Sequence, residues 1–192
     1  MIDLKLQVNE NYGRELAAFG PALKTVFARG INKGIRGAKT DAVKAVRQHY
    51  NVKSSGLRKK LNTPQSALAN RNKLRASLFA DNKPMSLALF GALPNSPEKK
   101  RPRGGVSVKV KKSRKRIPHS FVAQMKSGHV GVFVRKGKDS LPIDEKVGPS
   151  AFQMTGSPSV FATMTAGAEQ RTSAEIDHGL IREVEKINKR YS

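Results

Sequence analysis

The side chains that could perform acid–base or metal chemistry are few and scattered. The four histidines, His49, His119, His129 and His178, form no HxxxH or HxH pair, so their spacing predicts no metal site. His119 and Ser120 are adjacent, which is not how a nucleophile and its base are recruited. The chain has no cysteine, which excludes disulfides and thiolate metal sites. Neither a GxxxxGK[ST] nor a GxGxxG loop is present, and we expect no cofactor.

One acidic tripeptide resembles part of a catalytic motif. Asp144-Glu145-Lys146 fits the D-x-K half of a nuclease motif that holds a metal between carboxylates. The upstream Pro-Asp partner is missing, because Asp139 follows a lysine. A surface charge cluster is the simpler interpretation, so we expect no enzyme. A metal-dependent nuclease that uses Asp144 and Glu145 is the less favoured alternative.

The strongest chemical signal is positive charge. Lysine and arginine outnumber acids 37 to 14, giving a formal net charge of +23 over 192 residues. Solubility of a small domain needs a net charge of only about 2–8. Such self-repulsion is best tolerated when an anionic partner neutralises it. Nucleic acid is the first candidate, and an acidic protein surface or an anionic membrane is the second.

The basic residues gather in segments that predict contact with DNA phosphates. Residues 99–138 contain no acid at all. The predicted electrostatic DNA-binding residues are Arg58, Lys59, Lys60, Lys99, Lys100, Arg101, Arg103, Lys109, Lys111, Lys112, Arg114, Lys115, Arg116, Arg135, Lys136 and Lys138. The pattern has no helix-turn-helix, zinc-finger spacing or aromatic platform, so sequence-independent contact is favoured over base reading. A solvated lysine-rich face is the alternative.

Helices and strands must position the basic segments, and the first half of the chain predicts several of them. A strand-like start (Leu4, Leu6, Val8) precedes residues 21–50, whose apolar residues recur every three or four positions and predict a long basic helix. The stretch SSGLRKKL predicts a short helix. Residues 73–90 read as two strands joined by a turn, and residues 93–105 as a flexible basic loop rich in proline and glycine.

The second half predicts strands and then a helix. From residue 106, valines alternate with Ser107, Lys109 and Lys111, which predicts a strand with a row of lysines on one face. A basic connector and a hairpin turning at Ser127-Gly128 follow. Residues 139–150 read as an irregular crossing and residues 149–167 as helical. Residues 172–190 predict an amphipathic helix packed on the sheet, with contact to another copy of the chain as the alternative.

These elements predict an α+β fold in a single domain over residues 1–192. It would combine a long basic N-terminal helix, a central antiparallel sheet with hairpins and a C-terminal amphipathic helix. The N-terminus lacks a basic start followed by an apolar run, and no apolar run approaches 18 residues. We therefore expect a soluble protein, made in the cytoplasm and without membrane contact.

Residues 114–150, RKRIPHSFVAQMKSGHVGVFVRKGKDSLPIDEKVGPS, resemble the core of the prophage minor tail protein Z family, also called tail completion proteins. The matching pieces are Arg116-Ile117-Pro118, Phe121-Val122, Lys126-Ser127-Gly128-His129, Phe133-Val134-Arg135 and Leu141-Pro142-Ile143. The family usually has Gly-Ala where this chain has His119-Ser120. The N-terminal helix and the segment after it are also similar, so the resemblance spans roughly residues 20 to 155.

The resemblance implies a virion structural protein of a long-tailed phage or prophage. It would complete the tail at its head-proximal end and enable head–tail joining. Implied partners are the tail tube, the tail terminator and head–tail connector proteins, together with further copies of the chain in a ring. Such a protein resides in the tail and neck of the virion after assembly in the host cytoplasm. A ring around duplex DNA fits the basic surface, and a free non-specific nucleic-acid-binding protein is the alternative.

Overall fold

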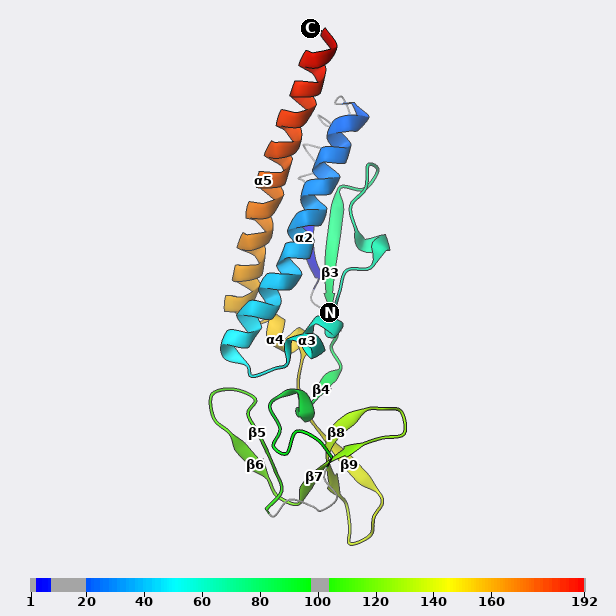
Figure 1. Ribbon diagram of the computed structural model, residues 1–192, viewed down its shortest axis with the longest axis vertical. Helices are drawn as coiled ribbons and strands as arrows, with labels where there is room; N and C mark the ends of the chain where they lie inside the picture. Colours follow the sequence, from blue (N-terminus) through cyan, green and yellow to red (C-terminus); the bar gives the residue numbers. More distant parts are fainter. Residues whose placement is uncertain (1–2, 8–19, 98–103, 192) are drawn as a thin grey trace. The chain divides into compact units, whose positions relative to one another are not determined.

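A computed structural model of the chain describes residues 3–7, 20–97 and 104–191 (Figure 1). It contains two compact units. Unit 1 comprises Met1–Ala42, Leu61–Ala80 and Gly156–Ser192, and unit 2 comprises Val43–Lys60 and Asp81–Thr155. The single domain expected from the sequence remains a prediction, as does the flexibility of the basic loop, whose residues 98–103 lie outside the described residues.

Two long helices are α2 (Pro21–His49) and α5 (Pro158–Tyr191); α5 and the part of α2 up to Ala42 belong to unit 1, where they run antiparallel (Figure 1). A Cβ on Gly30 of α2 would lie 2.6 Å from Ile176, and a Cβ on Gly179 of α5 would lie 2.3 Å from Val26. Each glycine thus permits a close approach that no larger residue would allow. The expected C-terminal helix is confirmed, but it packs on α2 instead of on the sheet.

The predicted boundaries of these helices differ in accuracy. For α2 the apolar period is confirmed, because Ile31, Ile35, Ala38 and Ala42 are all buried. The helical prediction for residues 149–167 is confirmed by a short helix, Ala151–Thr155, and by the first turns of α5. The start predicted at residue 172 is wrong, because α5 begins at Pro158 and continues through that position without a break.

The sheet of unit 1 has the order β1-β3-β2 and is antiparallel. Its strands are β1 (Asp3–Gln7), β2 (Leu61–Asn62) and β3 (Arg75–Ala80), which confirms the strand expected at Leu4 and Leu6. A short 3-10 turn, η1 (Gln65–Ala67), follows β2. The loop after it is fastened to α2, because the Asn32 amide donates to the Ala69 carbonyl at 2.9 Å and accepts from its N–H at 2.8 Å.

Unit 2 is built on an antiparallel sheet of order β4-β9-β8-β7. The strands are β4 (Pro84–Ser86), β7 (Ser120–Gln124), β8 (Val130–Arg135) and β9 (Ile143–Ser150). Two short helices, α3 (Ser54–Lys60) and α4 (Ala151–Thr155), and the turn η2 (Leu87–Leu89) complete the unit. Its core includes the fully buried Phe90, Met85, Val132 and Met154.

One hairpin and one helix predicted from the sequence are confirmed, and two strand predictions need correction. The β7–β8 hairpin forms with Gly128 at a φ of 81°, and α3 lies where SSGLRKKL predicted it. The two strands read from residues 73–90 exist, but β3 and β4 belong to different sheets. Residues 143–150 are a strand and not an irregular crossing, because β9 pairs with both β4 and β8 despite its glycine and proline. The α+β class is confirmed, with three antiparallel sheets in the described part of the chain.

Candidate nucleic-acid interface

A small two-stranded sheet carries the centre of the predicted basic surface. We call residues 106–117 the basic hairpin: β5 (Val106–Val108), the loop 109–114 and β6 (Lys115–Ile117). Its six cations, all exposed, are Lys109, Lys111, Lys112, Arg114, Lys115 and Arg116. The expected row of lysines on a strand face is wrong, because β5 ends at Val108 and the following lysines lie in the loop.

Backbone hydrogen bonds hold the basic hairpin against the core of unit 2. Leu93 and Ser107 exchange N–H···O bonds of 2.8 and 3.0 Å. The Lys109 N–H donates to the Phe90 carbonyl at 3.0 Å, and the Val110 carbonyl accepts from the Asn51 N–H at 2.9 Å. Because these bonds reach into the loop itself, its cations project from a fixed backbone.

A buried hydroxyl ties the hairpin to β7. Ser120 has no exposed surface, and its Oγ accepts from the Val106 N–H at 2.8 Å while it donates to the Ile117 carbonyl at 2.7 Å. The tight turn before it places His119 at a φ of 58°, a conformation that glycine adopts more easily. A tight turn therefore forms here with histidine, and not glycine, in the left-handed conformation. Gly105 is equally constrained, since a Cβ there would lie 2.0 Å from the Ile117 carbonyl oxygen.

The two faces of the hairpin carry different cations. Val108 pairs with Lys115 across the strands, and Ser107 pairs with Arg116, so these two pairs lie on opposite faces. Lys115, together with Lys111 of the loop, borders an apolar groove of about 750 Å³. Arg116 therefore points away from that groove, and neither Lys109 nor Lys112 lines it.

Arg114 has a structural role within the hairpin. Its guanidinium donates to the Gly91 carbonyl at 2.9 Å and to the Ser107 carbonyl at 3.1 Å. Reversing this charge would remove both bonds, so a reversal experiment aimed at DNA alone leaves Arg114 in place. Lys111 lies 5.3 Å from the centre of the Tyr50 ring, which directs its ammonium toward the groove.

The remaining described candidates form two other clusters in unit 2. Between β8 and β9, Arg135 stacks on the Phe121 ring at 5.4 Å, Lys136 pairs with Asp144 at 3.2 Å, and Lys138 is exposed. This cluster lies on the other side of the unit from the basic hairpin (Figure 1).

The third cluster is at the end of α3. Arg58 and Lys59 are exposed, whereas Lys60 pairs with Asp81 at 2.7 Å. The hydrogen bond from Lys60, followed by that from the Lys83 N–H, lowers the pKa of the Asp81 carboxyl. The structure therefore separates cations already paired with carboxylates from those left for a partner. Lys99, Lys100, Arg101 and Arg103 lie outside the described residues.

The geometry of β9 does not support the nuclease alternative. Asp144 and Glu145 are consecutive residues of a strand, so their side chains point to opposite faces and cannot share one metal ion. Asp144 pairs with Lys136, and Glu145 pairs with His129 at 2.8 Å. Among the described residues, no group of three or more His, Asp or Glu side chains could hold a metal.

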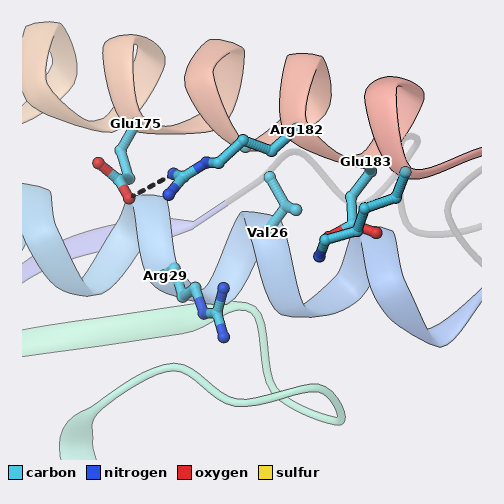
Figure 2. A pocket seen from close by; sticks show the side chains of 7 residues that line it. Val26, Arg29, Glu175, Arg182 and Glu183 are labelled. Atoms are coloured by element: carbon cyan, nitrogen blue, oxygen red, sulfur yellow. Dashed lines mark hydrogen bonds and ion pairs between the residues drawn. The ribbon is translucent and has the colours of Figure 1, made fainter. Parts of the chain in front are cut away.

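A small slot of about 100 Å³ between α2 and α5 is a feature that the sequence did not predict (Figure 2). Glu175 reaches toward Arg182 there, at 3.4 Å, and it also pairs with Lys33 of α2 at 2.5 Å. The hydrogen bond from Lys33 is the main cause that lowers the pKa of Glu175. An Arg171–Asp41 ion pair joins the same two helices. The acids of the slot are thus already paired, and the Lys33–Glu175 and Arg171–Asp41 pairs hold the two helices together.

Comparison with known families decides the class of protein. Residues 20–190 match the family model described as prophage minor tail protein Z (GPZ). The chain belongs to this family. It is therefore a structural protein of the phage tail, not an enzyme, and its partners include other tail proteins. A search of curated proteins and a search of solved structures find no match. In the described part of this tail protein, no helix is both long enough and apolar enough to cross a membrane.

Proposed function

We propose that this tail protein completes the head-proximal end of the tail, enables head–tail joining and contacts the DNA phosphate backbone there. The observation that carries the proposal is the basic hairpin. Its six cations are exposed on an anchored backbone, and none forms an ion pair with a carboxylate among the described residues. Uncompensated charge on a fixed element favours binding to a polyanion.

Duplex DNA is the polyanion that a neck encloses. Contacts with phosphates position a protein on DNA without reading sequence, which suits a passage that must admit any part of a genome. A closed ring of identical copies would repeat the contact around the DNA, so a weak contact per copy becomes strong in total. The tail tube, the tail terminator and the head–tail connector are the proposed neighbours in this assembly.

The outward cations of the hairpin are the proposed contact residues. Lys109, Lys112 and Arg116 are exposed, stay off the apolar groove and have no described carboxylate partner. Lys60 and Lys136 contribute less, because each is already paired with an aspartate.

The test is charge reversal with a matched control. The outer-face variant carries Lys109→Glu, Lys112→Glu and Arg116→Glu. The control carries Lys83→Glu, Lys126→Glu and Lys146→Glu, three exposed lysines of the same unit with the same change in total charge. Only the outer-face variant should lose binding to two unrelated duplexes of equal length, measured by fluorescence anisotropy. Equal loss in both variants would show that net charge alone decides binding.

Head–tail joining is tested separately with isolated heads and with tails that lack this protein. Wild-type protein and the control variant should restore joined particles, counted by electron microscopy, whereas the outer-face variant should leave heads and tails apart. Mass spectrometry of purified tails separates the proposal from a free nucleic-acid-binding protein, since absence of the chain from tails would contradict the proposal.

A further inference from the structure

The apolar groove under the basic hairpin has the form of a docking site for a segment of a protein. It lies entirely in unit 2 and has a volume of about 750 Å³, within the range of roughly 300–1,000 Å³ that is common for binding clefts. Its lining residues are Tyr50, Leu87, Val108, Val110, Lys111, Ser113, Lys115, Ile117, Pro149 and Gln153. The lining is thus an aliphatic and aromatic floor with two lysines at its border.

A groove of this kind selects a partner with apolar side chains flanked by acids. Burial of aliphatic groups against the apolar floor stabilises a complex by about 25 cal/mol per Å² of apolar surface removed from water. The two lysines, Lys111 and Lys115, favour carboxylates at the rim and disfavour a basic partner. The expected occupant is therefore an amphipathic acidic helix or strand, and not another part of a basic surface.

The chain itself carries a surface of this description on α5. Asp177, Ile181, Val184 and Glu185 stand at i, i+4, i+7 and i+8 and so share one face of the helix. Ile181 is 59% exposed and Val184 is 56% exposed, and because they stand three positions apart they form one uncovered apolar strip on this face. We call these four residues the acidic helix face.

The acidic helix face points away from α2. Ile176 and Gly179 lie against Gly30 and Val26 of α2, and the 3.6-residue period places them on the side of α5 opposite the acidic helix face. The two acids at the ends of the face, Asp177 and Glu185, are exposed and have no ion pair with a described residue. The face is therefore available to a partner together with its charge.

The distribution of acids along the chain also sets the hairpin and α5 apart. Five of the 14 acids fall within residues 169–185, whereas residues 99–138 contain none. Within this part of α5, five acids stand against only two arginines, Arg171 and Arg182, although the chain as a whole has a net charge of +23. The groove and this helix are complementary both in polarity and in sign.

We propose that the groove receives the acidic helix face of a second copy of the chain, so that copies join head to tail. The two surfaces differ, so each copy binds one neighbour through its groove and the other neighbour through its acidic helix face. Repetition of this contact closes a ring if the rotation between neighbours permits. This inference rests on the ring in the proposed function and names the two surfaces that build it. It also assigns the cations of the hairpin to two partners: Lys111 and Lys115 contact the neighbouring copy, whereas the outward cations contact DNA.

The experiment uses two variants with opposite charge on the two surfaces. The groove variant carries Lys111→Glu and Lys115→Glu, and the helix variant carries Asp177→Lys and Glu185→Lys. Sedimentation velocity of full-length, nucleic-acid-free protein over a concentration series should show self-association of the wild type. Each variant alone should associate at least about tenfold more weakly, which corresponds to about 1.4 kcal/mol.

Mixing the two variants gives the decisive result. In a mixture, the acidic groove of one variant can bind the basic helix of the other, and the unaltered groove of the second can bind the unaltered helix of the first, so association between the two variants should return. Recovery on mixing excludes misfolding as the cause of the loss. Wild type that stays monomeric at every concentration, or variants that do not recover on mixing, would overturn the head-to-tail contact.

A second pair of variants separates this inference from the DNA proposal. Ile181→Ser with Val184→Ser should abolish self-association without lowering thermal stability, because both side chains are exposed. Lys109→Glu with Lys112→Glu changes total charge as much as the groove variant, yet it should leave self-association unchanged and weaken DNA binding. Loss of association in this control would contradict the division of the hairpin, while loss of DNA binding alone would leave the ring contact standing.

Discussion

Replacement of Ser120 by alanine tests how the basic hairpin is fixed. The hydroxyl is fully buried and bonds the Val106 N–H at 2.8 Å and the Ile117 carbonyl at 2.7 Å. Alanine leaves the N–H of Val106, itself fully buried, without a partner, at a cost of about 1–3 kcal/mol. Loss of the second bond adds about 0.5–1.5 kcal/mol. We therefore expect the free energy of unfolding to fall by about 1.5–4.5 kcal/mol in Ser120→Ala, the sum of the two costs.

Urea denaturation followed by far-ultraviolet circular dichroism measures this loss, with a lower midpoint and an unchanged slope. Amide hydrogen exchange should become faster across residues 106–117 and stay unchanged in α2 and α5. Ser127→Ala, in the exposed turn between β7 and β8, is the matched control and should change stability by less than about 0.5 kcal/mol. A loss below about 0.5 kcal/mol in Ser120→Ala, with normal exchange, would refute the bridging role of the hydroxyl.

Three further predictions follow from the contacts. Gly179→Ala should destabilise the protein by about 1–3 kcal/mol in urea denaturation, because its new Cβ would overlap Val26. Unchanged stability would show that α2 and α5 can move apart at this contact without cost. Asp81 has a lowered pKa, so its pair with Lys60 contributes stability above the unfolded pKa of about 4 that is lost as pH falls through the folded pKa. Asp81→Asn should thus be less stable than wild type at pH 6 and equal to it near pH 2; a constant difference would contradict the linkage. Arg114→Gln should lower the thermal midpoint of unfolding more than a glutamine at Lys112, because only the arginine bonds two carbonyls.

The parts of the fold that the sequence predicted are those with local signals. The 3.6-residue period of α2 rests on large buried residues such as Ile31 and Ile35, and the β7–β8 hairpin rests on Gly128. Strand β9 was missed because glycine and proline interrupt its alternation, and its pairing with β4 and β8 is not visible in local sequence. Strand β6 was missed for a similar reason, since Lys115-Arg116-Ile117 looks like part of a basic connector until it pairs with β5.

For the candidate site, charge was predictable and the partner of each charge was not. Composition identified the cations of the hairpin, and the described ones are exposed as expected. Which cation is already used depends on residues distant in sequence: Arg114 bonds Gly91, and Lys60 pairs with Asp81. The groove is beyond sequence analysis for the same reason, since its lining comes from segments as far apart as Tyr50 and Gln153.

The central claim is that the outward cations of the basic hairpin contact DNA phosphates. The salt dependence of duplex binding tests this most directly, because each phosphate contact contributes about −0.9 to the slope of log K against log salt concentration. For Lys109→Glu, Lys112→Glu and Arg116→Glu together, the slope should become shallower by about 2–3 relative to wild type, and equally so on unrelated sequences. A slope equal to that of wild type, or wild-type binding that does not respond to salt, would contradict the claim.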